Sequence, residues 1–301
     1  MAVYVNTNVS SLNGRRYLNN VQNQLTTTYQ RLSSGMRINS AKDDAAGLQI
    51  ADRLTTQING LNQGNRNSND GIALAQTIEG ALDETSNMLQ KIRTLAVQSA
   101  NGTNTADDRK ALDTEAKSLQ AEITRIAEQT KFGGKTVLNG ATTADTIYGA
   151  QNGTGSAGGK LTLQVGANKG DEISFDVGKF TFSFVASVAA GKTANIGFSD
   201  GKIVLGTASK AKAAIELMDK MIAVVDSQRS GLGAIQNRLE SSIRNQSNVA
   251  ANQSDARSRI RDADFAEESA NLSQQSIIQQ AATSMLMQAN SRPQLALSML
   301  G

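Results

Sequence analysis

The sequence predicts a mainly α-helical protein, built as a long helical hairpin or coiled-coil rod from paired N- and C-terminal segments. Two observations predict this fold. Apolar residues recur at helical spacing from about residue 5 to 130 and again from about 208 to 300. Between these stretches that spacing stops, and glycine and phenylalanine become frequent. We therefore expect a β-hairpin and a small, mostly β central domain at the tip of the rod.

The composition narrows the class of protein. Of 301 residues, 39% are hydrophobic but only 4% are aromatic, so aliphatic side chains must build the core, which suits helix-on-helix packing. The net charge of +3 argues against a nucleic-acid partner, because phosphate binding needs concentrated Lys and Arg. The chain has no cysteine and no histidine, which removes thiolate chemistry, the usual general base and the commonest metal ligand. We expect no enzyme activity, no cofactor and no metal.

Membrane and targeting signals are also missing from the sequence. No apolar run approaches the ~18 residues of a membrane-spanning helix, so membrane insertion is not expected. The N-terminus lacks a basic start followed by an apolar stretch, so a cleaved secretory signal is not expected either. A protein exported without such a signal needs a dedicated route.

In the N-terminal part of the chain, the spacing of apolar residues and the capping residues predict a first helix and the start of a second. One apolar stripe runs by threes and fours through Val5, Val9, Leu12, Leu18, Val21, Leu25, Tyr29 and Leu32. Ser34-Gly35 then predicts the end of this helix. Ser40 with Asp43 predicts a capped start of the next helix. Its repeat continues only as far as the polar stretch 64–70.

The strongest helical signal follows that polar stretch. One heptad register contains Ala75, Ile78, Leu82, Thr85, Leu89, Ile92 and Ala96, with Thr85 in its single polar slot. The loop 101–104 breaks it. Thr105 followed by Asp108 predicts a capping box, and the repeat resumes to about residue 126. Two such helices form an antiparallel hairpin, and because each stripe is narrow, a third partner is required.

The centre predicts short strands. Residues 132–140 read as an extended segment bounded by turns, and apolar residues alternate over 161–165, 173–177 and 180–184. The alternation changes parity across Gly178-Lys179, which predicts a hairpin turn there. Residues 196–198 and 203–205 are candidates for further strands.

The helical period returns over residues 215–243. A final apolar seam contains Ile278, Ala281, Ala282, Met285, Leu286 and Ala289. Ser291-Arg292-Pro293 predicts a kink or the end of that last helix.

Both ends of the chain closely resemble bacterial flagellin. The N-terminal motifs are Asn6–Leu12 (NTNVSSL), Arg31–Gly35 (RLSSG), Ile38–Leu48 (INSAKDDAAGL), Leu89–Gln98 (LQKIRTLAVQ) and Gln129–Gly134 (QTKFGG). The C-terminal motifs are Ser258–Asp264 (SRIRDAD), Gln279–Leu286 (QQAATSML), Gln288–Asn290 (QAN) and Pro293-Gln294. The resemblance covers residues 1–140 and 206–301 in the correct order, whereas the centre, 141–205, matches nothing.

The resemblance implies a structural subunit that polymerises into the bacterial flagellar filament for swimming motility. It implies three domains: a terminal coiled coil lining the inner tube (1–42 plus 257–301), a helical bundle with a β-hairpin in the outer tube (43–140 plus 206–256), and a variable, surface-exposed β domain (141–205). It also implies export in unfolded form by the flagellar type III system to the outside of the cell. The implied partners are other copies of the chain, the flagellar cap and hook-associated proteins, and an export chaperone on the C-terminal segment.

The resemblance assigns three sets of site residues. The residues expected to pack in the inner tube are Leu18, Val21, Leu25, Leu32, Ile278, Ala282, Met285 and Leu286. Host Toll-like receptor 5 would be engaged by Gln90, Lys91, Leu95 and Glu115, although Lys91 stands where an arginine is usual; otherwise these residues are an exposed helix face with Leu95 in the core. The third set, a hairpin whose small shifts would change the supercoil form of the filament, contains Phe132, Gly133, Gly134, Val137 and Leu138. The alternative is that this hairpin is a static chain reversal.

Other functions stay open at this point. The terminal stripes could belong to an ordinary intramolecular bundle. A hook–filament junction protein has similar termini, and a secreted adhesin would depend on the central domain. Adjacent carboxylates such as Asp43-Asp44, Asp107-Asp108 and Glu267-Glu268 point in different directions on a helix, so we expect them to serve as caps or solvated faces.

Overall fold

The computed structural model describes residues 7–140, 146–148, 158–190, 198–199 and 202–298. The chain forms two compact units, one of residues 1–58 with 249–301 and one of residues 59–248. Parts of helices α2 (Ala45–Ala100) and α5 (Ala208–Arg261) belong to each unit. The predicted mainly α fold with a few small antiparallel strand pairs is confirmed.

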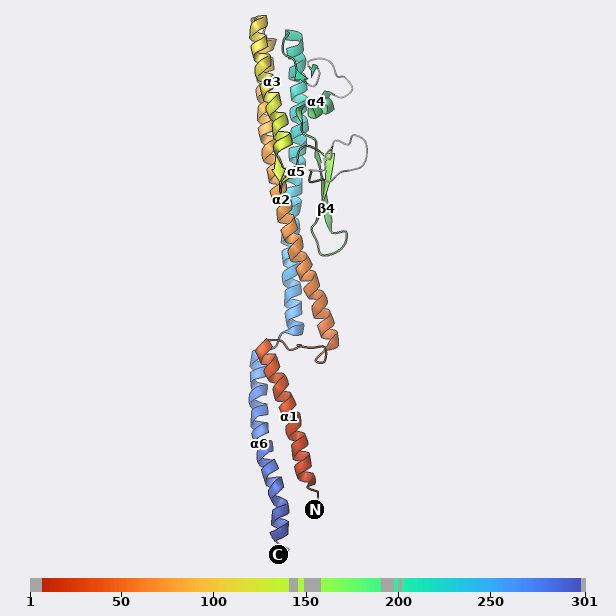
Figure 1. The fold of residues 1–301 in the computed structure, drawn as a ribbon, viewed down its shortest axis with the longest axis vertical. Helices are drawn as coiled ribbons and strands as arrows, with labels where there is room; N and C mark the ends of the chain where they lie inside the picture. The colour runs from red at the N-terminus through yellow and green to blue at the C-terminus, as the bar shows by residue number, and fades with distance from the viewer. Residues whose placement is uncertain (1–6, 141–145, 149–157, 191–197, 200–201, 299–301) are drawn as a thin grey trace. The chain divides into compact units, whose positions relative to one another are not determined.

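The terminal unit contains α1 (Val9–Ser34) and α6 (Phe265–Ser298), which lie side by side (Figure 1). Gly35 ends α1 in the left-handed conformation, with φ of 69°, and its N–H bonds the carbonyl of Arg31 at 2.8 Å, as predicted. Val5, the first residue of the predicted stripe, lies outside the described residues.

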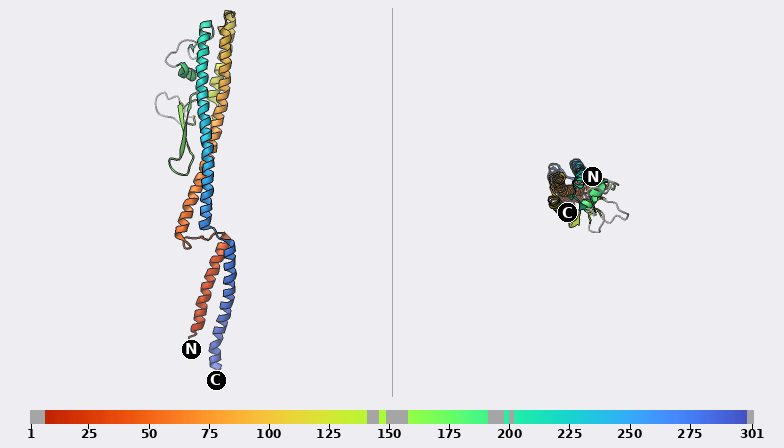
Figure 2. Two further views of the ribbon diagram at one scale, coloured as in Figure 1. Left: turned by 180° about the vertical axis from the view of Figure 1, so that it is seen from behind. Right: turned by 90° about the horizontal axis from the view of Figure 1, so that it is seen from above.

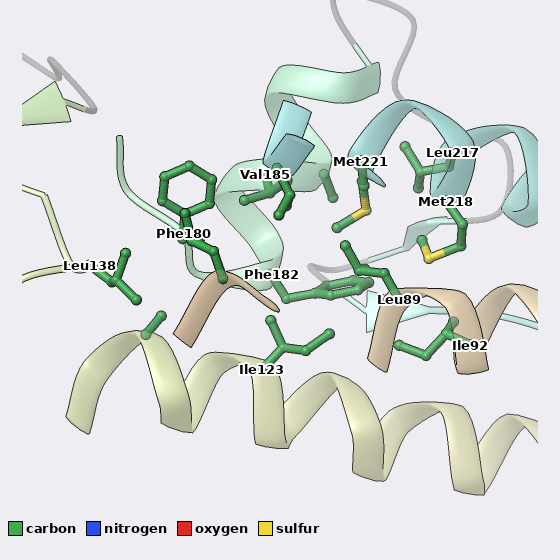
Figure 3. Close-up of a cluster of buried hydrophobic side chains, with 14 of the residues drawn as sticks. Leu89, Ile92, Ile123, Leu138, Phe180, Phe182, Val185, Leu217, Met218 and Met221 are labelled. Carbon is green, nitrogen blue, oxygen red and sulfur yellow. The ribbon is translucent and has the colours of Figure 1, made fainter. Parts of the chain in front are cut away.

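The second unit is built on α2, α3 (Ala106–Gln129) and α5. All seven members of the predicted heptad register, from Ala75 to Ala96, are buried, Thr85 included. Thr105 and Asp108 form the predicted capping box of α3. The three-partner requirement is met, because one buried cluster joins side chains of α2, α3 and α5 (Figure 3).

The strands form three antiparallel pairs among the described residues. β1 (Lys131–Phe132) pairs with β2 (Lys135–Thr136), and β5 (Phe198–Ser199) pairs with β6 (Lys202–Ile203). β3 (Gly158–Gln164) pairs with β4 (Glu172–Gly178) over seven residues, from Gly158↔Gly178 to Gln164↔Glu172. This hairpin lies beside α5 in front and back views (Figures 1 and 2).

The predicted strand over residues 180–184, with its turn at Gly178-Lys179, is wrong. These residues lead into helix α4 (Phe182–Ala190), and the real hairpin turn joins β3 to β4. Short apolar runs do not distinguish a strand from a buried helix by spacing alone. Here Phe182 and Val185 enter the shared core three residues apart on one side of α4, which only a helix allows (Figure 3).

Three helix boundaries also differ from prediction. Polar residues 64–70 do not interrupt α2. The Ser40 N–H donates to the Asp43 carboxylate at 2.8 Å, but this closes a turn; α2 starts at Ala45, where Asp44 accepts a bond from the Gly47 N–H at 2.9 Å. Pro293 does not end α6, which continues to Ser298. The other predicted outcome, a kink at Pro293, stays a prediction.

Candidate functional site: the terminal helix pair

The seam between α1 and α6 buries few apolar side chains. Among the described residues it holds Val21, Leu25 and Ala282, together with the polar Thr28 and Glu268. Fully burying a large aliphatic side chain contributes roughly 1.5–3 kcal/mol, so this seam by itself gives little stability against the entropy of ordering two helices. The helix pair therefore has a small core of its own.

Polar contacts align the two helices along their length. Asn8 caps α1 and its side-chain amide donates to the carbonyl of Ala289 at 2.7 Å. Further along, the amide of Gln279 donates to Gln22 Oε1 at 2.7 Å. Rising residue numbers in α1 thus meet falling numbers in α6, and the helices are antiparallel.

An ion pair closes the other end of the seam. Arg31 Nη1 lies 3.1 Å from Glu268 Oε1, and the Glu268 side chain is only 8% exposed. The expectation that Glu268 is a cap or solvated residue is therefore wrong. Adjacent Glu267 is exposed on the other side, and no signal within the α6 sequence distinguishes the two carboxylates.

The segments following α1 and α5 are joined by backbone hydrogen bonds. Met36 and Asp262 form an antiparallel bridge, and the Arg37 N–H donates to the carbonyl of Arg261 at 2.7 Å. The Ala263 N–H donates back to the carbonyl of Gly35 at 3.0 Å. These bonds hold the end of α1 next to the junction between α5 and α6.

The outer faces of the pair carry large apolar side chains. Tyr17 and Tyr29 on α1 are more than half exposed, and on α6 Ile277 is 66% and Met285 is 70% exposed. The others are Val9, Leu12, Phe265 and Met287. A groove of about 550 Å³ is lined by Ser10, Asn13, Gly14, Tyr17, Ala282, Met285, Gln288 and Ala289. Large apolar side chains exposed along a groove, as Tyr17 and Met285 are here, are typical of an association site.

The predicted packing residues divide between seam and surface. Val21, Leu25 and Ala282 are buried in the seam; Leu18, Leu32, Ile278 and Leu286 are half-buried; Met285 is exposed. Their packing in a tube stays a prediction.

The predicted receptor residues lie on α2 and α3. Gln90, Lys91 and Glu115 are exposed, and Lys91 Nζ lies 3.2 Å from Glu115 Oε1. Leu95 is instead buried in the shared core at 7% exposure. The structure thus brings three of the four side chains to the surface and places Leu95 beneath them.

The predicted switch hairpin is formed by β1 and β2. Gly133 and Gly134 occupy its turn with φ of 57° and 84°, which the two-residue hairpin turn requires. A side chain at either glycine would meet open space. Val137 and Leu138 are fully buried, so the hairpin is anchored in the core at one end.

Two carboxylates outside the seam, Asp43 and Asp108, serve local turns and caps. Hydrogen bonds from the backbone N–H groups of Ser40 and Asn39 lower the pKa of Asp43. The hydroxyl of Thr105, and then its backbone N–H, lower the pKa of Asp108. Among the described residues no group of His, Cys, Asp or Glu is arranged to hold a metal ion. No described helix has an apolar stretch that could span a lipid bilayer.

A mainly helical fold, whose paired terminal helices bury few apolar side chains and leave large ones exposed, is typical of a structural subunit. Two family profiles match this chain: the bacterial flagellin N-terminal helical region over residues 5–143 and the C-terminal helical region over residues 215–300. Flagellin A of Vibrio anguillarum and flagellin B of Vibrio cholerae are each 38% identical to it, with the whole of both chains aligned.

The chain belongs to the bacterial flagellin family. Among solved structures, a candidate flagellar hook-associated protein from Vibrio parahaemolyticus matches with a TM-score of 0.56 at 19% identity, covering 73% of this chain and all of that one; this likeness supports the fold alone. The family is structural and not enzymatic. As a member, this chain is a subunit of the extracellular flagellar filament.

Proposed function

We propose that α1 and α6 form the inner tube of the filament and become fully ordered only when neighbouring copies cover their outer faces. The observation that carries this is a contrast among the described residues, where three apolar residues are buried in the seam and eight large ones around it are exposed. Assembly supplies the missing apolar contacts, so folding of the ends and polymerisation are coupled. Contacts between different faces of successive copies build an open helical filament.

Two kinds of variant test this. Deleting residues 257–301 should abolish filaments while leaving 43–256 folded. Ile277→Ser and Met285→Ser, at exposed positions, should leave the monomer's circular dichroism unchanged and greatly slow seeded filament growth. Val188→Ser is the matched control, because Val188 is 49% exposed in the other unit. Normal filaments from the truncated chain would refute the assignment.

The seeded filament growth assay also distinguishes a filament subunit from a hook–filament junction protein. A junction protein caps growth, whereas a filament subunit extends into long tubes. The 38% identity to proteins named flagellin, with the whole of both chains aligned, favours a subunit that extends the filament.

The sparse seam is also consistent with transport of the chain in unfolded form. We propose that the chain leaves the cell unfolded through the flagellar type III system, with a chaperone covering the apolar face of α6 before export. The chain then adds beneath the cap. A chain without cysteine has no disulfide to hinder such passage. Mutating the export apparatus should retain the protein inside the cell, and Ile277→Ser should weaken capture by the chaperone.

We further propose that the monomer activates Toll-like receptor 5 through Gln90, Lys91 and Glu115, with buried Leu95 supporting the α2 surface beneath them. The exposed ion pair gives this face adjacent charges of both signs. Glu115→Ala and Gln90→Ala should each reduce the response of a receptor reporter cell line, whereas Lys110→Ala, exposed on the same helix as Glu115, should not. No response to the monomer at saturating dose would refute this proposal.

For the hairpin of Phe132, Gly133, Gly134, Val137 and Leu138, we propose a role in setting the supercoil form of the filament. Its open turn can shift while its buried end stays anchored. Gly134→Ala, strained at positive φ, should change the supercoil seen by electron microscopy, whereas Gly134→Asn should preserve it.

A further inference from the structure

Several asparagines in this chain are followed directly by glycine. The pairs are Asn13-Gly14, Asn59-Gly60, Asn101-Gly102, Asn139-Gly140 and Asn152-Gly153. In such a pair the backbone nitrogen of the glycine can attack the side-chain amide of the asparagine, because glycine has no Cβ to obstruct the approach. The last pair lies outside the described residues, and the structure holds the others in different backbone conformations.

The chemistry of this attack sets a geometric requirement. The glycine nitrogen bonds to Cγ of the asparagine, its proton passes through solvent to the side-chain nitrogen, and that nitrogen leaves as ammonia. Water then opens the resulting succinimide ring at either carbonyl, which gives aspartate or isoaspartate. Ring closure therefore needs a glycine N–H without a hydrogen-bond partner and a backbone that can turn toward the asparagine side chain.

Two of the pairs are held in regular helices. Asn13-Gly14 lies in α1 and Asn59-Gly60 lies in α2. A helical backbone directs each N–H along the helix axis to a carbonyl of the preceding turn, so the glycine nitrogen points away from the neighbouring side chain. Asn59 is nevertheless exposed to solvent. Exposure alone therefore does not meet the geometric requirement.

A third pair, Asn139-Gly140, is fixed by packing. It follows Leu138, which is fully buried and whose carbonyl accepts a bond from the Phe180 N–H at 2.9 Å. Gly140 is itself buried, in the left-handed conformation with φ of 68°. Ring closure here would require the backbone to move beside the shared core, where water has little access.

The pair Asn101-Gly102 meets the requirement. It lies in the loop between the end of α2 and the start of α3, and both residues are exposed. Nothing lies within 4 Å of a side-chain carbon placed at Gly102. Within the part of the chain that the structure describes, neither the Gly102 N–H nor the Asn101 side-chain amide has a hydrogen-bond partner.

Arg109 of α3 holds the backbone next to this pair. Its guanidinium donates to the carbonyl of Ser99 at 2.9 Å and to the carbonyl of Asn101 at 3.0 Å. In isoaspartate the chain continues through the side chain, so the former backbone carbonyl of Asn101 becomes a carboxylate. A hydrogen bond from the guanidinium to a carboxylate is stronger than one to a neutral carbonyl, so the modified loop keeps its tie to α3.

We propose that Asn101 is a site of spontaneous deamidation and reacts faster than the other described Asn-Gly pairs. Aspartate and isoaspartate accumulate at this position in the native protein, and each adds a negative charge to the exposed loop. The site depends on the folded second unit and not on filament growth.

Peptide mass mapping of the full-length monomer, aged at mildly alkaline pH, tests this proposal. Asn101 should lose its amide at least tenfold faster than Asn59 or Asn139. In urea, where the fold is lost, the three rates should come within about threefold of one another. Asn13 does not serve as a control, because its protection depends on how far α1 is formed in the monomer. Equal native rates at Asn101, Asn59 and Asn139 would overturn the proposal.

A variant at Gly102 tests the ring closure itself. In Gly102→Ala the added methyl meets open space, so the fold should be unchanged, but the methyl obstructs the attacking nitrogen and should slow amide loss at Asn101 at least fivefold. Gly80→Ala is the matched control, because Gly80 is exposed in α2, follows Glu79, and has nothing within 4 Å of its added carbon. It should leave the rate at Asn101 within twofold of the wild type. Equal rates in the two variants would contradict attack by the Gly102 nitrogen.

The product distinguishes ring closure from direct hydrolysis of the side chain. Ring opening should give isoaspartate at residue 101, detected by methylation with a protein isoaspartate methyltransferase. Aspartate alone at this position would overturn the proposed route.

Discussion

Arg31 of α1 and Glu268 of α6 form the ion pair that ends the terminal seam, with 3.1 Å between Nη1 and Oε1. Because the Glu268 side chain is buried and Arg31 is about one-third exposed, the pair is neither a surface bridge nor a fully buried one. At this end of the seam, the ion pair therefore favours one register of α1 against α6.

Glu268→Ala should weaken the helix pair by about 1–2 kcal/mol, because the arginine loses a charged hydrogen-bond partner but keeps partial access to water. In assembly this corresponds to a roughly 5- to 30-fold higher critical concentration for filament growth. Asp255→Ala breaks the exposed Asp255–Arg259 pair and should change it less than twofold. Equal effects of the two substitutions would contradict a special role for the seam pair.

Phe182→Ala should destabilise the second unit by about 3–5 kcal/mol, measured by urea unfolding of the monomer. Phe182 is fully buried near Leu89, Ile123 and Met221, so its removal leaves a cavity in the shared core (Figure 3). Val188→Ala, on the exposed side of the same helix, should cost less than about 1 kcal/mol. A small loss for Phe182→Ala would mean that α4 is not part of this core.

Asp113→Ala should cost about 1–3 kcal/mol, because it removes the acceptor of a buried backbone donor. The Leu205 N–H donates to Asp113 Oδ1 at 2.8 Å, and Leu205 is fully buried. Asp113→Asn keeps an acceptor oxygen at this position and should retain most of the stability. The comparison is made by thermal unfolding, and similar losses in both variants would show that charge and not the acceptor matters.

Stability should fall at alkaline pH through Tyr148. Burial raises the pKa of its phenol, whose hydroxyl donates to the carbonyl of Val137 at 2.6 Å. Its contribution is fully present below the unfolded pKa of about 10 and is lost above it, at up to ~1.4 kcal/mol per pH unit.

Tyr148→Phe should be less stable than the wild type near pH 8 by about 1 kcal/mol, since the hydrogen bond is lost. The difference should shrink or reverse as the pH rises from 10 to 12. Urea unfolding at several pH values measures it, and a constant difference over that range would exclude Tyr148 as the titrating group.

Local sequence rules predicted the long helices and several of their ends well. The heptad register from Ala75 to Ala96, the capping box at Thr105 and the stop at Gly35 depend on neighbours within one helical turn or on a single stripe. The prediction failed at Phe182, where five apolar-rich residues fit two periods equally well. Packing against side chains of α2, α3 and α5 decides that this segment is helical and not a strand. Local spacing carries no information about those distant partners.

For the terminal helix pair too, the sequence predicted some features and not others. The apolar stripes of α1 and α6 were visible as repeats, and their partial exposure follows from their narrowness. The burial of Glu268, by contrast, depends on Arg31 lying opposite, more than two hundred residues away in the chain.

The sequence by itself determined that this protein is a mainly helical flagellin whose two ends pair, because periodicity and motifs are written in consecutive residues. Only the tertiary structure decided that the central segment shares the core of the helices and that Glu268 is inside the seam. Both depend on contacts between segments distant in the chain, where burial and close approach outweigh local preference.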